Sequence, residues 1–408
     1  MKRQLIAIFI ISVLFATSGC WNRRELNTLA IIMAIGIDKA PEDGKIKLTT
    51  QVLKPDEIKA PAATGGQGSP KGVWVLTSTG HTIFDAYRNA TMQSDRKLYN
   101  SQTKVIVISE EMARAGVRPI LDFFDRDHEL RRLSWLLIAK GEAKDIIEAE
   151  HEQEKIPAQA IESLVTASGA TSMAVTVNLH EFLKMLANKA TDPFASRIEI
   201  IAEEETEKKA AKKPKPEESQ QNGPRKRMRL TGAAVFKDDK LAGWLNRPET
   251  RGLNWILGKV KSGIIIVKSP KDENQYVALE IIRASSKIIP EIRDGQVTIT
   301  VEVEEEGNLG EQMSDVDLTT PEYFDSLERR QATVIKNEIA AVLRKAQKEW
   351  GTDIFGFGDA IHRKFPREWK KLEKKWDTEF SQIEVKVKVI STLKRFGLHT
   401  APAGTKRE

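Results

Sequence analysis

Residues 29–38 read LAIIMAIGID, an almost unbroken apolar run of strand length. Such a run predicts a β-strand that is buried on both faces. The turn residues Glu42, Asp43 and Gly44 follow, and residues 45–53 (KIKLTTQVL) then alternate apolar and polar side chains. This alternation predicts a half-exposed second strand that pairs with the first through the turn.

Strand and helix patterns continue to alternate along the chain, which predicts α/β or α+β architecture in the first region. Residues 206–228 break the pattern because they carry Lys, Glu and Pro with almost nothing to bury, and they predict a flexible, charged loop. Further strands are predicted at 73–78, 104–109, 133–139, 198–201, 232–236, 241–245 and 263–268, and helices at 82–92, 117–124, 143–150, 156–166, 179–188 and 249–255.

The last third of the chain has the clearest pattern. Residues 297–303 alternate apolar and polar side chains, which predicts a strand with one face exposed to solvent. Residues 323–350 place their apolar side chains in one helical stripe, and Pro366 begins another helix. Residues 383–390 close the block as a strand. The predicted fold class is α+β, with three mixed α/β domains at 20–142, 143–270 and 271–400, in which antiparallel or mixed sheets carry packed helices.

The N-terminal segment has the features of a signal peptide, predicted at residues 1–19. Lys2 and Arg3 precede the apolar residues 5–15, which are too few for the roughly 20-residue helix that spans a bilayer. Small residues lead to Cys20, the single cysteine, so cleavage is predicted between Gly19 and Cys20. The Cys20 thiol is then expected to carry diacylglycerol, with a possible N-acyl group, which anchors the protein to the outer face of the cytoplasmic membrane. The alternative is an unmodified structural cysteine.

The composition argues against several classes of function. The net charge of +6 comes from 64 basic and 58 acidic residues, which suits an anionic membrane nearby but matches no nucleic-acid motif. An acylated Cys20 leaves no thiolate, and the six histidines form no HExxH or His-x-His motif. No G-x-S-x-G elbow occurs either. Apart from the covalent lipid on Cys20, we therefore expect no metal, no cofactor and no catalytic residue.

Residues 353–375 (DIFGFGDAIHRKFPREWKKLEKK) are the most unusual stretch. One interpretation is a tight turn between two helices, with the aromatic side chains in the core and the lysines in water. The other is a basic surface that contacts anionic lipid or an acidic partner. The basic residues concerned are Arg363, Lys364, Arg367, Lys370, Lys371, Lys374 and Lys375.

Motifs spread over nearly the whole mature chain also resemble those of a known family. They are residues 20–26 (CWNRREL), 29–39, 80–86 (GHTIFDA), 97–108, 119–124 (PILDFF), 232–236 (GAAVF), 243–245 (GWL) and 353–369. In this order they resemble the C-subunit lipoproteins of bacterial spore germinant receptors, the GerAC/GerBC type. Thr17, Asn22 and the charged insertion at 206–228 depart from that pattern.

The resemblance implies a non-enzymatic, lipid-anchored subunit at the inner membrane of the spore. It would act with integral membrane subunits of the A and B types in nutrient-triggered germination, without necessarily binding the small-molecule germinant itself. Two other classes stay open. A solute-capturing membrane lipoprotein would need a deep cleft between two similar lobes, and a cell-envelope hydrolase would need a catalytic pair in a groove.

Overall fold

The computed structural model describes residues 2–6, 25–55, 72–149, 151, 153–202 and 226–395. Cys20 and most of the predicted signal peptide lie outside these residues, as does the charged loop up to residue 225. None of the helices within the described ranges combines the length and the apolar character needed to cross a bilayer.

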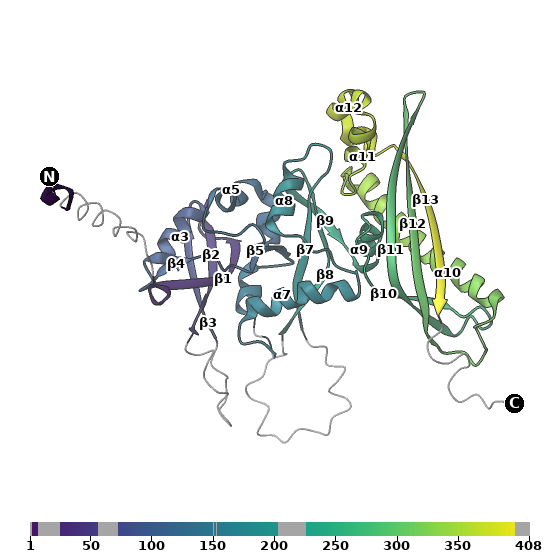
Figure 1. Cartoon of the computed structure of the whole chain (residues 1–408), viewed down its shortest axis with the longest axis horizontal. Coiled ribbons are helices and arrows are strands. Elements are labelled where there is room, and N and C mark those ends of the chain that lie inside the picture. The colour runs from purple at the N-terminus through teal and green to yellow at the C-terminus, as the bar shows by residue number, and fades with distance from the viewer. Residues whose placement is uncertain are drawn as a thin grey trace, which may run out of the picture.

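The first sheet is mixed and has nine strands, which confirms the predicted α+β class (Figure 1). Its order is β3-β2-β1-β5-β6-β7-β8-β9, with β4 beside β1. β1, β5, β6 and β7 run parallel, whereas the strands on both flanks are antiparallel. The strands are β1 (Leu29–Lys39), β2 (Ile46–Leu53), β3 (Val73–Gly80), β4 (Lys97–Tyr99), β5 (Val105–Ser109), β6 (Trp135–Ala139), β7 (Phe194–Ala202), β8 (Lys226–Lys237) and β9 (Lys240–Leu245).

Helices cover both faces of this sheet, which is why β1 is apolar along its length. Ile35 of β1 belongs to the same core as residues of α3, α5 and α8. Met33 of β1 packs into a second core with residues of α6 and α7. The helices are α3 (Ile83–Thr91), α4 (Glu110–Ala115), α5 (Arg118–Arg126), α6 (Ala143–Glu148), α7 (Pro157–Ala167) and α8 (Leu179–Leu186), with short 3-10 turns η1 (Leu26–Thr28) and η2 (Ser168–Ala170).

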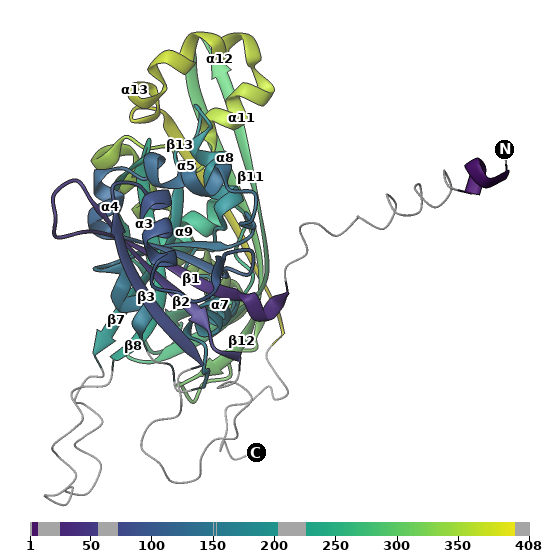
Figure 2. The same ribbon diagram turned by 90° about the vertical axis from the view of Figure 1, so that its left-hand side faces the viewer.

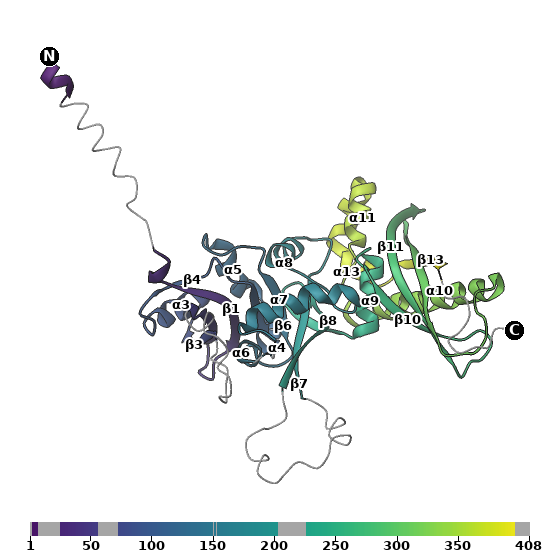
Figure 3. The same ribbon diagram turned by 60° about the horizontal axis from the view of Figure 1, so that its bottom comes forward.

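The second sheet has four strands in the order β10-β11-β12-β13, and the long helix α10 lies on one of its faces (Figures 1 and 3). β12 and β13 run parallel, so the chain between them forms a crossover that contains α10 to α13. The elements are α9 (Arg247–Ile256), β10 (Gly263–Lys268), β11 (Tyr276–Arg293), β12 (Gln296–Gln312), α10 (Pro321–Arg344) with its π-helical continuation Lys345–Trp350, α11 (Phe357–Lys364), α12 (Pro366–Leu372), η5 (Glu373–Lys375), α13 (Trp376–Phe380) and β13 (Glu384–Arg395).

Several sequence predictions are corrected by the structure. Residues 226–228 are not loop but the start of β8, where they pair with β7. β2 is more buried than predicted, because Gln51 accepts a hydrogen bond from the Ala158 N–H at 3.0 Å and donates to the Ile147 carbonyl at 3.0 Å. β4, α4 and the 18-residue strand β11 were not predicted.

The strand pairing also bears on the domain bounds. The first sheet continues through residue 142 without a break, because β6 pairs with β7. β10 pairs with β11 and so belongs to the second sheet, whereas the sequence placed it in the middle domain. The division into three domains at these bounds stays a prediction.

Candidate functional site: a basic helical cap

The predicted basic residues gather on one structural unit, the basic cap, which we define as residues 357–375. The cap comprises α11, α12 and the turn η5, and it lies at the top of the molecule in Figures 1 and 2, beside the upper end of β11. The seven basic residues that the sequence singled out are all exposed there: Arg363, Lys364, Arg367, Lys370, Lys371, Lys374 and Lys375.

The cap is held by the carboxylate of Asp353, which is 2% exposed. Backbone N–H groups of residues 355–357 donate to its Oδ1 at 3.0–3.3 Å. The Gly358 N–H donates to Oδ2 at 2.8 Å, and the indole N–H of Trp376 donates to the same oxygen at 3.2 Å. One side chain thus satisfies the free N–H groups at the start of α11 and fixes α13 beside it.

The two glycines of the motif have separate structural reasons. Gly356 has φ +78°, a left-handed conformation that favours glycine. A Cβ on Gly358 would lie 2.6 Å from the Ala190 carbonyl oxygen, so only glycine allows this approach. Phe355 and Phe357 stack in the core with ring centroids 5.1 Å apart. The turn interpretation of the glycines and aromatics is confirmed.

The cap is fastened to the first sheet through the loop between α8 and β7. Asp359 of α11 accepts hydrogen bonds from the Asn188 amide at 2.7 Å and from the Thr191 hydroxyl at 2.9 Å. The Asp192 N–H donates to the Asp353 carbonyl at 2.8 Å. None of these loop residues was singled out from the sequence, since their partners lie far along the chain.

Two carboxyls at this junction have perturbed protonation. Burial raises the pKa of Asp353 to about 6, because the loss of water outweighs the hydrogen bonds that stabilise the carboxylate. Burial raises the pKa of Asp192 to about 7, and the negative charges of Asp377 and Asp353 add to this effect. These carboxyls support structure, because Asp192 itself accepts a hydrogen bond from the Asp238 N–H at 3.0 Å.

Most of the basic side chains of the cap are exposed to solvent. The Lys364 ammonium donates to the Pro290 carbonyl at 2.9 Å, and Lys375 pairs with Glu379 at 2.7 Å. Within the described part of the chain, Lys370, Lys371 and Lys374 form no ion pair. The arrangement leaves cationic groups available to an anionic surface, and whether they contact one stays a prediction.

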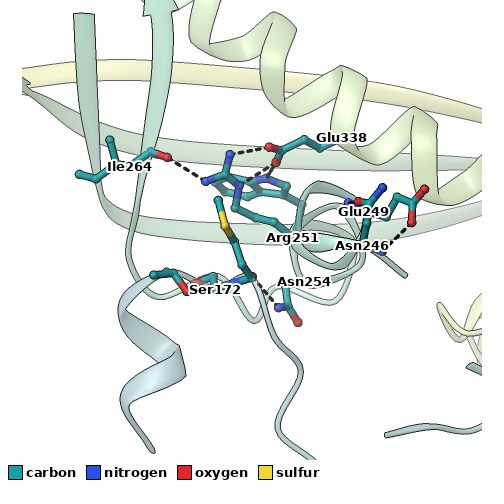
Figure 4. A network of polar contacts seen from close by, with 10 residues as sticks. Ser172, Asn246, Glu249, Arg251, Asn254, Ile264 and Glu338 are labelled. Atoms are coloured by element: carbon teal, nitrogen blue, oxygen red, sulfur yellow. Dashed lines mark hydrogen bonds and ion pairs between the residues drawn. The ribbon is translucent and has the colours of Figure 1, made fainter. Parts of the chain in front are cut away.

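A second polar network, which the sequence did not reveal, joins the two sheets (Figure 4). The guanidinium of Arg251 on α9 forms a bidentate ion pair with Glu338 on α10, and both are buried. Arg251 also donates to the Ile264 carbonyl at 2.9 Å, and the Trp255 indole donates to Glu338 at 3.0 Å. Asn254 reaches back to the carbonyls of Ser172 and Ala174 at 2.9 and 3.0 Å.

Two hollows in the described part of the chain are smaller than typical ligand pockets. One hollow of about 270 Å³ lies between the ends of β1, β2 and β3 and the residues before β4. Another, of about 200 Å³, lies beside Trp135, Asn254 and Lys259. Both volumes fall below the roughly 300–1,000 Å³ of typical ligand pockets. Among the described residues no group of three or more His, Cys, Asp or Glu is arranged to hold a metal.

The fold and this surface define an α+β protein of two mixed sheets with a fastened, exposed basic cap. Residues 22–200 match the family model "Spore germination protein N-terminal domain", and residues 231–397 match "Spore germination B3/GerAC like, C-terminal". The chain is 30% identical to spore germination protein KC of Bacillus subtilis (strain 168) over 98% of both chains, and 27% identical to spore germination protein B3 of the same organism over 94% and 96%.

A solved structure has the same fold. The crystal structure of the GerBC protein matches with a TM-score of 0.53 at 22% identity, covering 88% of this chain and 96% of that chain. The resemblance found in the sequence is therefore confirmed. The chain belongs to the GerAC/GerBC family of spore germination proteins.

Proposed function

We propose that this chain is a non-enzymatic, lipid-anchored subunit of a spore germinant receptor, acting with integral membrane subunits of the A and B types. The observation that carries the proposal is the end-to-end similarity to spore germination protein KC, which covers 98% of both chains. A chain related over its whole length presents the same elements to its surroundings, so a shared role in germination is the simplest conclusion.

The buried carboxylates support a binding role over a catalytic one. Asp353 is surrounded by hydrogen-bond donors of its own turn, and Glu338 is paired with Arg251. Glu305 of β12 accepts a hydrogen bond from the Ser391 hydroxyl of β13 at 2.7 Å. Each carboxylate is thus used to join two elements of the fold, whereas a glycoside hydrolase needs a carboxyl pair that flanks its substrate. The exposed basic cap provides a surface for a partner.

Membrane attachment is proposed through diacylglycerol on Cys20, which would place the protein on the outer face of the cytoplasmic membrane and at the inner membrane of the spore. Two acyl chains give stable anchoring, whereas one chain gives only marginal binding. The anchor would bring the body close to the integral subunits. The germinant need not bind this subunit.

The test replaces the thiol. We expect Cys20→Ala to leave the body folded but to move the protein out of the spore membrane fraction and to slow nutrient-triggered germination. The matched control is Ser18→Ala, which keeps the thiol and a small residue before it. Mass spectrometry of the mature N-terminus reads the modification directly. An unmodified Cys20, or normal germination with Cys20→Ala, would sink the proposal.

A further inference from the structure

The helix α3 and its C-cap Met92 carry a stripe of large exposed side chains, although the Phe84 ring also packs against Phe123 of α5 with ring centroids 5.8 Å apart. Phe84 is 51% exposed and Met92 is 79% exposed, and Arg88 lies between them at the same four-residue spacing. Residues four apart lie on one side of a helix. The Arg88 guanidinium lies 4.9 Å from the centre of the Phe84 ring. The stripe therefore presents two large apolar side chains and a cation together.

The chain order places this stripe at the edge where the described body begins. Residues 93–96 lead from α3 into β4, whose Lys97 pairs with Leu29 at the start of β1. Leu26, in the turn η1 just before β1, is 73% exposed. Figures 1 and 3 show α3 and β4 at the end of the molecule where the chain enters β1. We call Leu26, Phe84, Arg88, Met92 and Arg96 the α3 edge.

The covalent chain limits how far this edge can lie from an anchor on Cys20. Glu25 follows Cys20 by five residues. A fully extended chain spans at most about 3.3–3.6 Å per residue, so Glu25 lies within about 18 Å of the acylated residue. The tether thus keeps the start of the described body near the bilayer, on the side of the first sheet where the chain enters β1.

The charge of the edge fits an anionic surface. Arg88 and Arg96 are exposed, and Arg23 and Arg24 precede the edge in the sequence. The acidic residues Glu25, Asp85 and Asp95 lie in the same segments, so the four arginines leave only a small net positive charge. Cations near an anionic bilayer are attracted by about 1 kcal/mol each, while apolar side chains enter the headgroup boundary. Both kinds of residue point to lipid as the partner.

We propose that the α3 edge is the membrane-facing surface of this protein, with Leu26, Phe84 and Met92 entering the headgroup region of an anionic bilayer. The proposal rests on the acylation of Cys20 advanced above. It assigns an orientation: the first sheet lies next to the bilayer at its β1–β4 end.

The chain allows a clean test, because Cys20 is its single cysteine. In the full, acylated protein, Met92→Cys creates one free thiol for an environment-sensitive fluorophore. Met313→Cys is the matched control, since Met313 is 61% exposed and follows β12 of the second sheet. The labelled proteins are bound to phosphatidylglycerol-containing vesicles with quenchers attached to the lipid. We expect severalfold stronger quenching at position 92 than at position 313.

Co-sedimentation of the same samples separates the two proposals. Protein that pellets with the vesicles but is quenched equally at both positions would overturn the orientation and leave the anchor standing. Protein that stays in solution would overturn both. A label at position 92 that responds only when the integral receptor subunits are added would assign the edge to a protein partner and also overturn the proposal.

A second variant measures the contribution of the apolar side chains. Phe84→Asp with Met92→Asp removes the half-exposed Phe84 ring from its contact with Phe123, so circular dichroism and thermal melting check that the fold is kept. With a label at Leu26→Cys, we expect this pair to reduce quenching severalfold. Unchanged quenching would show that the tether alone holds the edge near the lipid and that the apolar stripe does not enter it, against the proposal.

Discussion

Arg251 and Glu338 form a buried bidentate ion pair although 87 residues separate them in the sequence. The pair lies where α9 crosses α10, and Gly252 allows that crossing, because a Cβ there would lie 2.2 Å from the Glu338 carbonyl oxygen. Since α9 follows the first sheet and α10 covers the second, this contact joins the two halves of the molecule.

Removal of one partner should therefore destabilise the fold strongly. Glu338→Ala leaves the Arg251 charge buried without its counterion, at a cost of about 3–5 kcal/mol in the free energy of unfolding. The matched control is Asp122→Ala, which breaks the exposed Arg126–Asp122 pair and should cost little, because water screens exposed charges. Urea unfolding of both variants checks this, and equal losses would contradict the importance of the buried pair.

Asp353→Ala should loosen the basic cap. The substitution leaves several backbone N–H groups and the Trp376 indole without their acceptor, and each buried unsatisfied donor costs about 1–3 kcal/mol. We expect a loss of at least about 3 kcal/mol and faster hydrogen exchange in α11. The control is Asp317→Ala, whose exposed carboxylate also accepts a backbone N–H, from Thr319. Similar losses for the two variants would argue against a special role for Asp353.

The buried carboxyls predict a pH dependence of stability. Burial raises the pKa of Glu305 to about 7, and it also raises the pKa values of Asp353 and Asp192. A carboxyl whose pKa is higher in the folded state than in the unfolded state favours folding when it is protonated. Its contribution to the free energy of unfolding is therefore complete below about pH 4 and is lost as the pH rises through about 6–7. Stability should therefore fall from pH 5 to pH 8.

Glu305→Gln tests this dependence at one site. The amide cannot ionise, so we expect a higher urea midpoint than the parent at pH 8 and a flatter profile between pH 5 and pH 8. Glu304→Gln is the control, because Glu304 is the exposed neighbour on the same strand. A variant profile parallel to that of the parent would contradict the raised pKa of Glu305.

Neutralisation of the basic cap should weaken its association with acidic surfaces. Replacing Lys370, Lys371, Lys374 and Lys375 with Gln keeps good helix formers and removes four cations from the cap. Because the α3 edge, and not the cap, is proposed to face the bilayer, binding of the unlipidated body to the integral subunits is measured at low salt. Lys386→Gln with Lys388→Gln on β13 is the control. Unchanged binding of the quadruple variant would reduce the cap to a solvated helix surface.

The sequence predicted what depends on neighbouring residues. The strand β1, the helix α10 and the turn around Gly356 each have a local pattern, and each is found in the structure. β11 was missed because its polar residues and Pro290 interrupt the alternation, although β12 and β10 pair with it. The Arg251–Glu338 pair has no local signal at all. The acylation of Cys20 stays a prediction, since that residue lies outside the described ranges.

The parallel pairing of β12 with β13 has a genetic consequence. β13 is synthesised only after the whole crossover that contains the cap. Its Leu393 N–H donates a hydrogen bond to the Glu328 carboxylate of α10 at 2.8 Å. A stop codon anywhere before Glu384 would remove this strand and leave one side of β12, including Val301, without its neighbour. Truncations that remove β13 should thus behave as null alleles, whereas missense changes on the exposed side of β13 should be tolerated.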